Sequence, residues 1–122
     1  MPGALLSLLT RRAESEADVA RIEATMRHEA NQRQYGNIAL RNAIAAIDAS
    51  GGVVSRHQTI NLQSYCVGRL IAGGCIDEAE AEAALVDAGL RTGKDRREVV
   101  RTVRAAIRAG AAQPRCAPER VQ

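Results

Sequence analysis

Four arginines near the end of the sequence have the spacing of one helix face. Arg97, Arg101, Arg104 and Arg108 recur at i, i+4, i+7 and i+11, so at about 100° per residue they fall within a narrow band. A row of guanidinium groups is suited to contacting a nucleic-acid backbone, because the planar fork of arginine matches phosphate oxygens. A solvated face, paired with an acidic helix, is the alternative interpretation.

Two further residue types bear on nucleic-acid binding. Arg56 and His57 stand at the start of a predicted helix, whose positive end attracts anions; local capping and pairing is the alternative. Single-strand binders usually add aromatic platforms, but this chain has only Tyr35 and Tyr65, and both fall within apolar helical patterns. We expect both tyrosines to pack in the core. Binding would then be directed to the backbone, sensitive to salt and weakly specific.

The remaining chemistry-bearing residues lack the spacing of a known kind of site. His28 and His57 have no second ligand at metal spacing, and Cys66, Cys75 and Cys116 fit neither a zinc site nor a disulfide framework. The sequence contains no Gly-rich phosphate loop, nucleophile elbow or clustered pair of carboxylates. We therefore expect no metal, no cofactor and no enzymatic activity, and a reduced, cytoplasmic compartment.

The composition bounds the fold that must position these residues. The chain has 122 residues, of which 46% are hydrophobic and 2% aromatic, which predicts one domain with a thin aliphatic core. The net charge of +3 is unevenly spread. Residues 76–90 carry five acids and no base, whereas residues 91–122 carry nine bases and three acids. An acidic helix followed by a basic one is the expected result.

Apolar spacing and end signals predict an all-α fold, a small bundle of about five short helices. We place the helices at residues 15–31, 35–50, 55–73, 77 to about 90, and 95–110. Four starts carry capping signals, at Ser15, Ser55, Asp77 and Asp95. Four ends carry glycine, at Gly51-Gly52, Gly73-Gly74, Gly89 to Gly93, and Gly110.

The two ends of the chain are expected to differ from this helical domain, which spans residues 15–112. Residues 1–14 contain a short apolar run and are interpreted as a docking segment that binds a partner through Leu5, Leu6, Leu8 and Leu9. Arg11-Arg12 follow this run and no base precedes it, which is the wrong order for a signal peptide, and the run is too short to cross a membrane. Residues 113–122 are predicted to be a flexible tail.

From Tyr35 to Arg115 the chain resembles a helical domain that accompanies primase, primase-polymerase or helicase modules in the replication proteins of phages, plasmids and integrated elements. The first part of the resemblance consists of Tyr35, Ala39-Leu40, Ala43, Ser55–Asn61, Tyr65, Gly68, Leu70 and Ala72–Gly74. The second part consists of Asp77–Leu85, Gly89-Leu90, Glu98, Thr102–Gly110 and Pro114-Arg115. Arg56 and Asn61 match the family pattern, whereas His57 replaces an asparagine and Ala105-Ala106 replace Ser-Gly.

This resemblance implies a noncatalytic module of a mobile-element replication apparatus that orients a primase or helicase and touches template DNA. Arg56 and Asn61 then join the four arginines as the expected contact set. The alternative is a protein-interaction module that regulates or inhibits a partner, in the form of a homodimer or a complex with another protein. The apolar run at residues 5–9 and the thin core favour that alternative.

Overall fold

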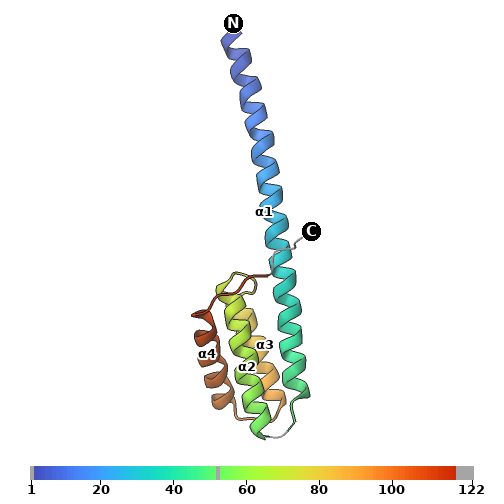
Figure 1. The fold of residues 1–122 in the computed structure, drawn as a ribbon, viewed down its shortest axis with the longest axis vertical. Helices are drawn as coiled ribbons and strands as arrows, with labels where there is room; N and C mark the ends of the chain where they lie inside the picture. The colour runs from blue at the N-terminus through green and yellow to red at the C-terminus, as the bar shows by residue number, and fades with distance from the viewer. Residues whose placement is uncertain (1, 52, 118–122) are drawn as a thin grey trace. The chain divides into compact units, whose positions relative to one another are not determined.

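The computed structural model describes the backbone of residues 2–51 and 53–117, and the side chains of residues 15–51 and 55–117. Within these residues the chain forms four helices and no strand: α1 (Pro2–Ala49), α2 (Val53–Ala72), α3 (Glu78–Arg91) and α4 (Arg96–Ala111) (Figure 1). The predicted all-α class is confirmed. The contacts divide the chain into two compact units, residues 1–31 and residues 32–122.

The prediction of two separate helices at residues 15–31 and 35–50 is wrong, because both lie within α1. Ser15 is inside this helix and caps nothing. Residues 31–34 are Asn, Gln, Arg and Gln, which interrupt the apolar pattern but include no helix breaker. The following Gly36 is tolerated in the helix, and a Cβ there would overlap the backbone of Cys75.

The first unit is the N-terminal part of α1. Every side chain of residues 15–31 is exposed, including three large apolar ones, Val19, Ile22 and Met26. The backbone of the predicted docking segment is helical from Pro2 onward. The side chains of Leu5, Leu6, Leu8 and Leu9 lie outside the described residues, so their expected partner surface stays a prediction.

Helix ends in the second unit follow the sequence signals, with two exceptions, Ser55 and Gly110. Gly110 lies inside α4, which continues to Ala111. Asp77 and Asp95 are N-caps whose carboxylates accept the backbone N–H groups of Glu80 (3.1 Å) and Glu98 (3.4 Å). Gly74 and Gly93 follow α2 and α3 with positive φ angles of 83° and 87°, which favour glycine. The predicted cap at Ser55 is wrong, since α2 begins at Val53.

The core of the second unit is aliphatic, as the composition predicts. Its buried residues come from all four helices and the turn before α3: Leu40, Ala43, Ile47, Ile60, Val67, Leu70, Cys75, Ile76, Ala81, Leu85, Ala88, Val99, Val103 and Ile107. Two glycines bring α2 and α4 close together, because a Cβ at Gly68 would overlap the backbone of Ile107 and one at Gly110 the backbone of Tyr65. Helix α4 therefore packs tightly along α2 (Figure 1).

The segment that follows α4 differs from the predicted flexible tail. Arg69 Nε donates to the carbonyl oxygen of Gln113 (2.8 Å), and the Arg115 N–H donates to the carbonyl oxygen of Arg69 (3.0 Å). The Ala117 N–H donates to Gln32 Oε1 (3.0 Å). Residues 113–117 are thus held on the helices, since tertiary hydrogen bonds replace the local ones that their sequence lacks. Residues 118–122 lie outside the described part.

Candidate nucleic-acid interface

Helix α4 has one buried and one charged face, and the buried face fixes its orientation. Val99, Val103, Ala106, Ile107 and Gly110 are buried. The four predicted contact arginines, Arg97, Arg101, Arg104 and Arg108, are all exposed. We call these four the arginine ridge. The apolar residues anchor the helix, so the ridge presents its guanidinium groups to solvent.

The members of the arginine ridge differ in their partners. Arg104 forms an ion pair through its Nε with a carboxylate oxygen of Glu82 on α3, and the two side chains are 65% and 28% exposed. Within the described residues, no hydrogen bond or ion pair engages the side chains of Arg97, Arg101 or Arg108. Pairing with the acidic helix is therefore seen for Arg104 only, while the exposure of all four side chains also agrees with the solvated-face alternative.

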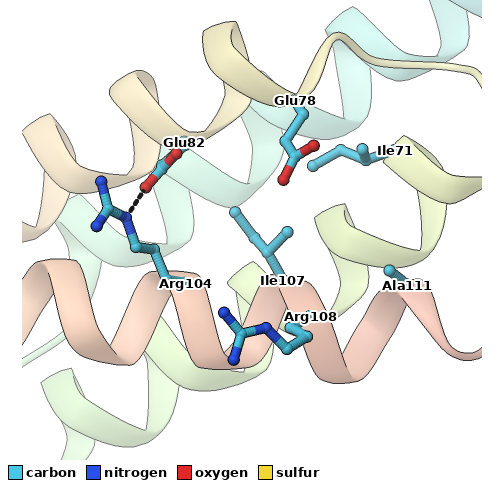
Figure 2. Close-up of a pocket in the computed structure, with 7 residues that line it drawn as sticks. All are labelled: Ile71, Glu78, Glu82, Arg104, Ile107, Arg108 and Ala111. Carbon is cyan, nitrogen blue, oxygen red and sulfur yellow. Dashed lines mark hydrogen bonds and ion pairs between the residues drawn. The ribbon is translucent and has the colours of Figure 1, made fainter.

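A cavity of about 360 Å³ lies between α3, α4 and the end of α2 (Figure 2). Its lining is Ile71, Glu78, Glu82, Arg104, Ile107, Arg108 and Ala111. In Figure 2 the Arg104–Glu82 pair stands at one end, while Glu78 and Arg108 project from opposite helices on either side of Ile107. The carboxylates of α3 thus face the C-terminal half of the ridge across this cavity.

A second, more open hollow of about 420 Å³ lies over the N-terminal half of α4. It is lined by Arg96, Arg97, Val100, Arg101 and Arg104, and no carboxylate contributes to its lining. Arg96 was not in the predicted contact set, because it lies about 100° around the helix from Arg97 and so off the periodic band. The adjacent pair Arg96-Arg97 at the helix start was the available signal.

The acids nearest to this hollow in sequence already have partners. Asp95 caps α4 by accepting the N–H of Glu98 (3.4 Å). The Glu98 carboxylate pairs with Lys94 Nζ (3.3 Å). Both negative charges are therefore engaged at the start of the helix, where carboxylates also complement the helix dipole.

The structure places Arg56 and Asn61 on α2, apart from the two hollows of α4. Arg56 is half-buried, and its Nη1 donates to the carbonyl oxygen of Thr92 (3.0 Å), just after α3. The Arg56 Nε atom is buried and has no partner within the described residues. Arg56 thus ties α2 to the end of α3. Asn61 is exposed and has no hydrogen bond to the ridge.

Both tyrosines lie on helices and are half-buried. Tyr35 packs against the core, and its hydroxyl accepts from Arg115 Nη2 (3.2 Å). Tyr65 lies where α2 meets Gly110 of α4. The predicted packing of Tyr35 against the core is confirmed. Neither tyrosine lines the hollows of α4.

The cysteines and histidines form no cluster within the part of the chain that the structure describes. No group of three His, Cys, Asp or Glu side chains is placed to hold a metal ion there. Cys75 is buried, and its thiol donates to Gln32 Oε1 (2.9 Å), which gives it a structural partner. Cys66 and Cys116 are exposed free thiols.

Compared with protein-family models, curated proteins and solved structures, this chain matches none. Among the described residues, no helix combines the length and apolar character required to cross a bilayer. The two-sided helix α4, with its charged ridge, is therefore the feature on which a functional proposal depends.

Proposed function

We propose that this chain is a noncatalytic, DNA-associated helical module that contacts the nucleic-acid backbone through the arginine ridge of α4. The resemblance over Tyr35–Arg115 makes a mobile-element replication apparatus, with a primase or helicase as partner, the setting of this proposal. One observation carries it. Arg97, Arg101 and Arg108 are exposed on one helix face, and within the described residues none of them has a carboxylate partner.

The physical support for the proposal is that the helix arranges these charges before DNA binds. A helix held by a buried apolar face fixes the spacing of the arginine backbone positions before binding, so only the side chains must be ordered when phosphates arrive. Each phosphate contact releases condensed counterions, which makes the affinity fall with salt. Both tyrosines are half-buried and neither lines the hollows of α4, which is why backbone contacts dominate the proposal.

A salt titration tests this proposal. Binding of the full chain to fluorescent single-stranded and double-stranded DNA is measured by anisotropy between about 50 and 200 mM salt. The variant R97Q/R101Q/R108Q should flatten the slope of log K against log salt by about 0.9 per lost contact on duplex DNA. The control is R27Q/R33Q/R41Q, which removes three exposed arginines of α1 and so changes the net charge equally.

The control variant should bind as the unmodified chain does. The absence of binding at low salt would overturn the proposal, and so would an equal loss in both triple variants, since only net charge would then matter.

A second candidate function rests on a different observation. Val19, Ile22 and Met26 lie at i, i+3 and i+7 on α1, and are 50%, 58% and 60% exposed. An apolar stripe at this spacing is typical of a helix that packs against another helix. This observation favours a protein-interaction module that regulates a partner or forms a homodimer.

Light scattering separates this candidate from DNA binding alone. If the unmodified chain self-associates, its measured mass exceeds that of a monomer. The variant V19S/I22S/M26S, or removal of residues 1–14, should then reduce the measured mass toward that of the monomer. The control A17S/A20S/A24S introduces the same residue type on the other side of the helix. A monomeric mass for the unmodified chain would exclude self-association.

A further inference from the structure

The two halves of α4 offer different electrostatic surroundings to a phosphate. Arg96, Arg97, Arg101 and Arg104 line the hollow over Val100, and no carboxylate contributes to its lining. Arg104 and Arg108 line the cavity that α4 shares with Glu78 and Glu82 of α3 (Figure 2). An equal spacing of arginines along the helix therefore does not give an equal capacity to bind an anion.

We propose that the phosphate-binding site is confined to the N-terminal half of α4, that Arg96 belongs to it, and that Glu82 withholds Arg104 from it. This inference rests on the proposed function and deepens it. It adds a residue outside the periodic band and assigns to α3 the role of limiting the affinity.

Competition for Arg104 is the first step of the argument. Its Nε is engaged by the Glu82 carboxylate, so a phosphate must displace that carboxylate before it gains the same guanidinium. The net gain from an exchange of one anion for another is small. Arg104 therefore contributes less to binding than Arg97 or Arg101, although all three are exposed.

Repulsion is the second step. A phosphate at Arg108 would approach the cavity into which Glu78 projects from the opposite helix. Because the two carboxylates of α3 line the same cavity as Arg108, they oppose a further negative charge there. The C-terminal half of the ridge is thereby disfavoured for a polyanion.

The N-terminal half lacks competition of this kind, and no carboxylate lines its hollow. Arg96, Arg97 and Arg101 have no ion pair within the described residues, and the nearby acids Asp95 and Glu98 are engaged by the helix cap and by Lys94. Three guanidinium groups around one hollow can donate to several oxygens of the same backbone segment. We therefore place the phosphate-binding site at Arg96, Arg97 and Arg101.

Single substitutions at matched positions test this inference in the salt titration with duplex DNA. R96Q, R97Q and R101Q should each flatten the salt slope by about 0.9, whereas R104Q and R108Q should change it by less than half as much. E82Q should release Arg104, steepen the slope toward one additional contact and tighten binding several-fold. The control E80Q makes the same charge change at an exposed residue of the same helix.

The outcomes separate the inference from the function on which it rests. No DNA binding by the unmodified chain overturns the proposed function. Binding with an unaffected R96Q variant, or with equal effects of E82Q and E80Q, overturns the inference and leaves the function standing. Thermal unfolding of each variant checks the fold, and the R96Q comparison tests the inference independently if E82Q unfolds.

Discussion

Helix α1 contains two stretches of similar sequence character in opposite surroundings. Residues 15–31 carry Val19, Ile22 and Met26 at helical spacing, and every side chain in that stretch is exposed. Residues 32–49 carry Leu40 and Ile47 at similar spacing, and both are buried. Apolar periodicity therefore predicts a helix in each case, but it does not predict whether the apolar face is covered within the same chain.

The difference also separates two sources of helix stability. The described residues of the first stretch show local contacts, such as the Arg21–Asp18 ion pair (2.6 Å). An exposed pair of this kind contributes about 0.2–0.5 kcal/mol. The second stretch gains from burial, at roughly 25 cal/mol per Å² of apolar surface. The predictions that follow compare matched residues in these two environments.

The largest expected effect comes from truncating isoleucines of the same helix. Ile47 is 0% exposed, so Ile47→Ala should lower the free energy of unfolding by about 2–5 kcal/mol through lost burial and a residual cavity. Ile22→Ala, in the exposed stretch, should change it by less than about 0.5 kcal/mol. Urea denaturation monitored by circular dichroism measures both. Equal effects would show that Ile22 is also buried in solution, as in a dimer.

A glycine substitution should rank second. A Cβ at Gly68 would overlap the backbone of Ile107, so Gly68→Ala must push α2 and α4 apart and should destabilise the fold by about 1–3 kcal/mol. The higher helix propensity of alanine, worth about 1 kcal/mol, opposes this loss. Gly51→Ala is the control, because nothing lies within 4 Å of its Cβ position. Increased thermal stability of the Gly68 variant would contradict the close helix packing.

Two aspartates provide a smaller comparison. Asp95 caps α4, and Asp95→Ala should cost about 0.5–1 kcal/mol, the lower part of the range for a helix cap because its hydrogen bond is long at 3.4 Å. Asp18→Ala removes only an exposed pair in the first stretch and should cost less than about 0.5 kcal/mol. Thermal unfolding of the two variants checks this order, and a reversed order would contradict it.

The smallest expected effect concerns the ion pair between α3 and α4. Arg104 is 65% exposed, so Glu82→Gln should change the free energy of unfolding by no more than about 1 kcal/mol. Denaturation at low and high salt measures this change. A much larger loss would indicate that Glu82 is mainly structural, and the R96Q comparison would then carry the binding test.

The sequence predicted much of the local structure and less of the candidate site. The caps at Asp77 and Asp95 and the turn at Gly74 were predicted correctly, because each signal lies within a few residues of the helix end that it marks. The break between residues 31 and 35 was wrong, since loss of apolar periodicity does not end a helix without a breaker. The order of residues 113–117 depends on Gln32 and Arg69, which are distant in sequence.

For the arginine ridge, the sequence by itself determined that four guanidinium groups share one face of a helix with an apolar underside. Only the tertiary structure decided which of these charges are paired, because Arg104 pairs with Glu82 of α3, which lies 22 residues earlier in the sequence. It also placed Arg56 against Thr92 and Arg96 beside the hollow over Val100. Periodicity is a local property of the chain, whereas ion pairing depends on how separate helices pack.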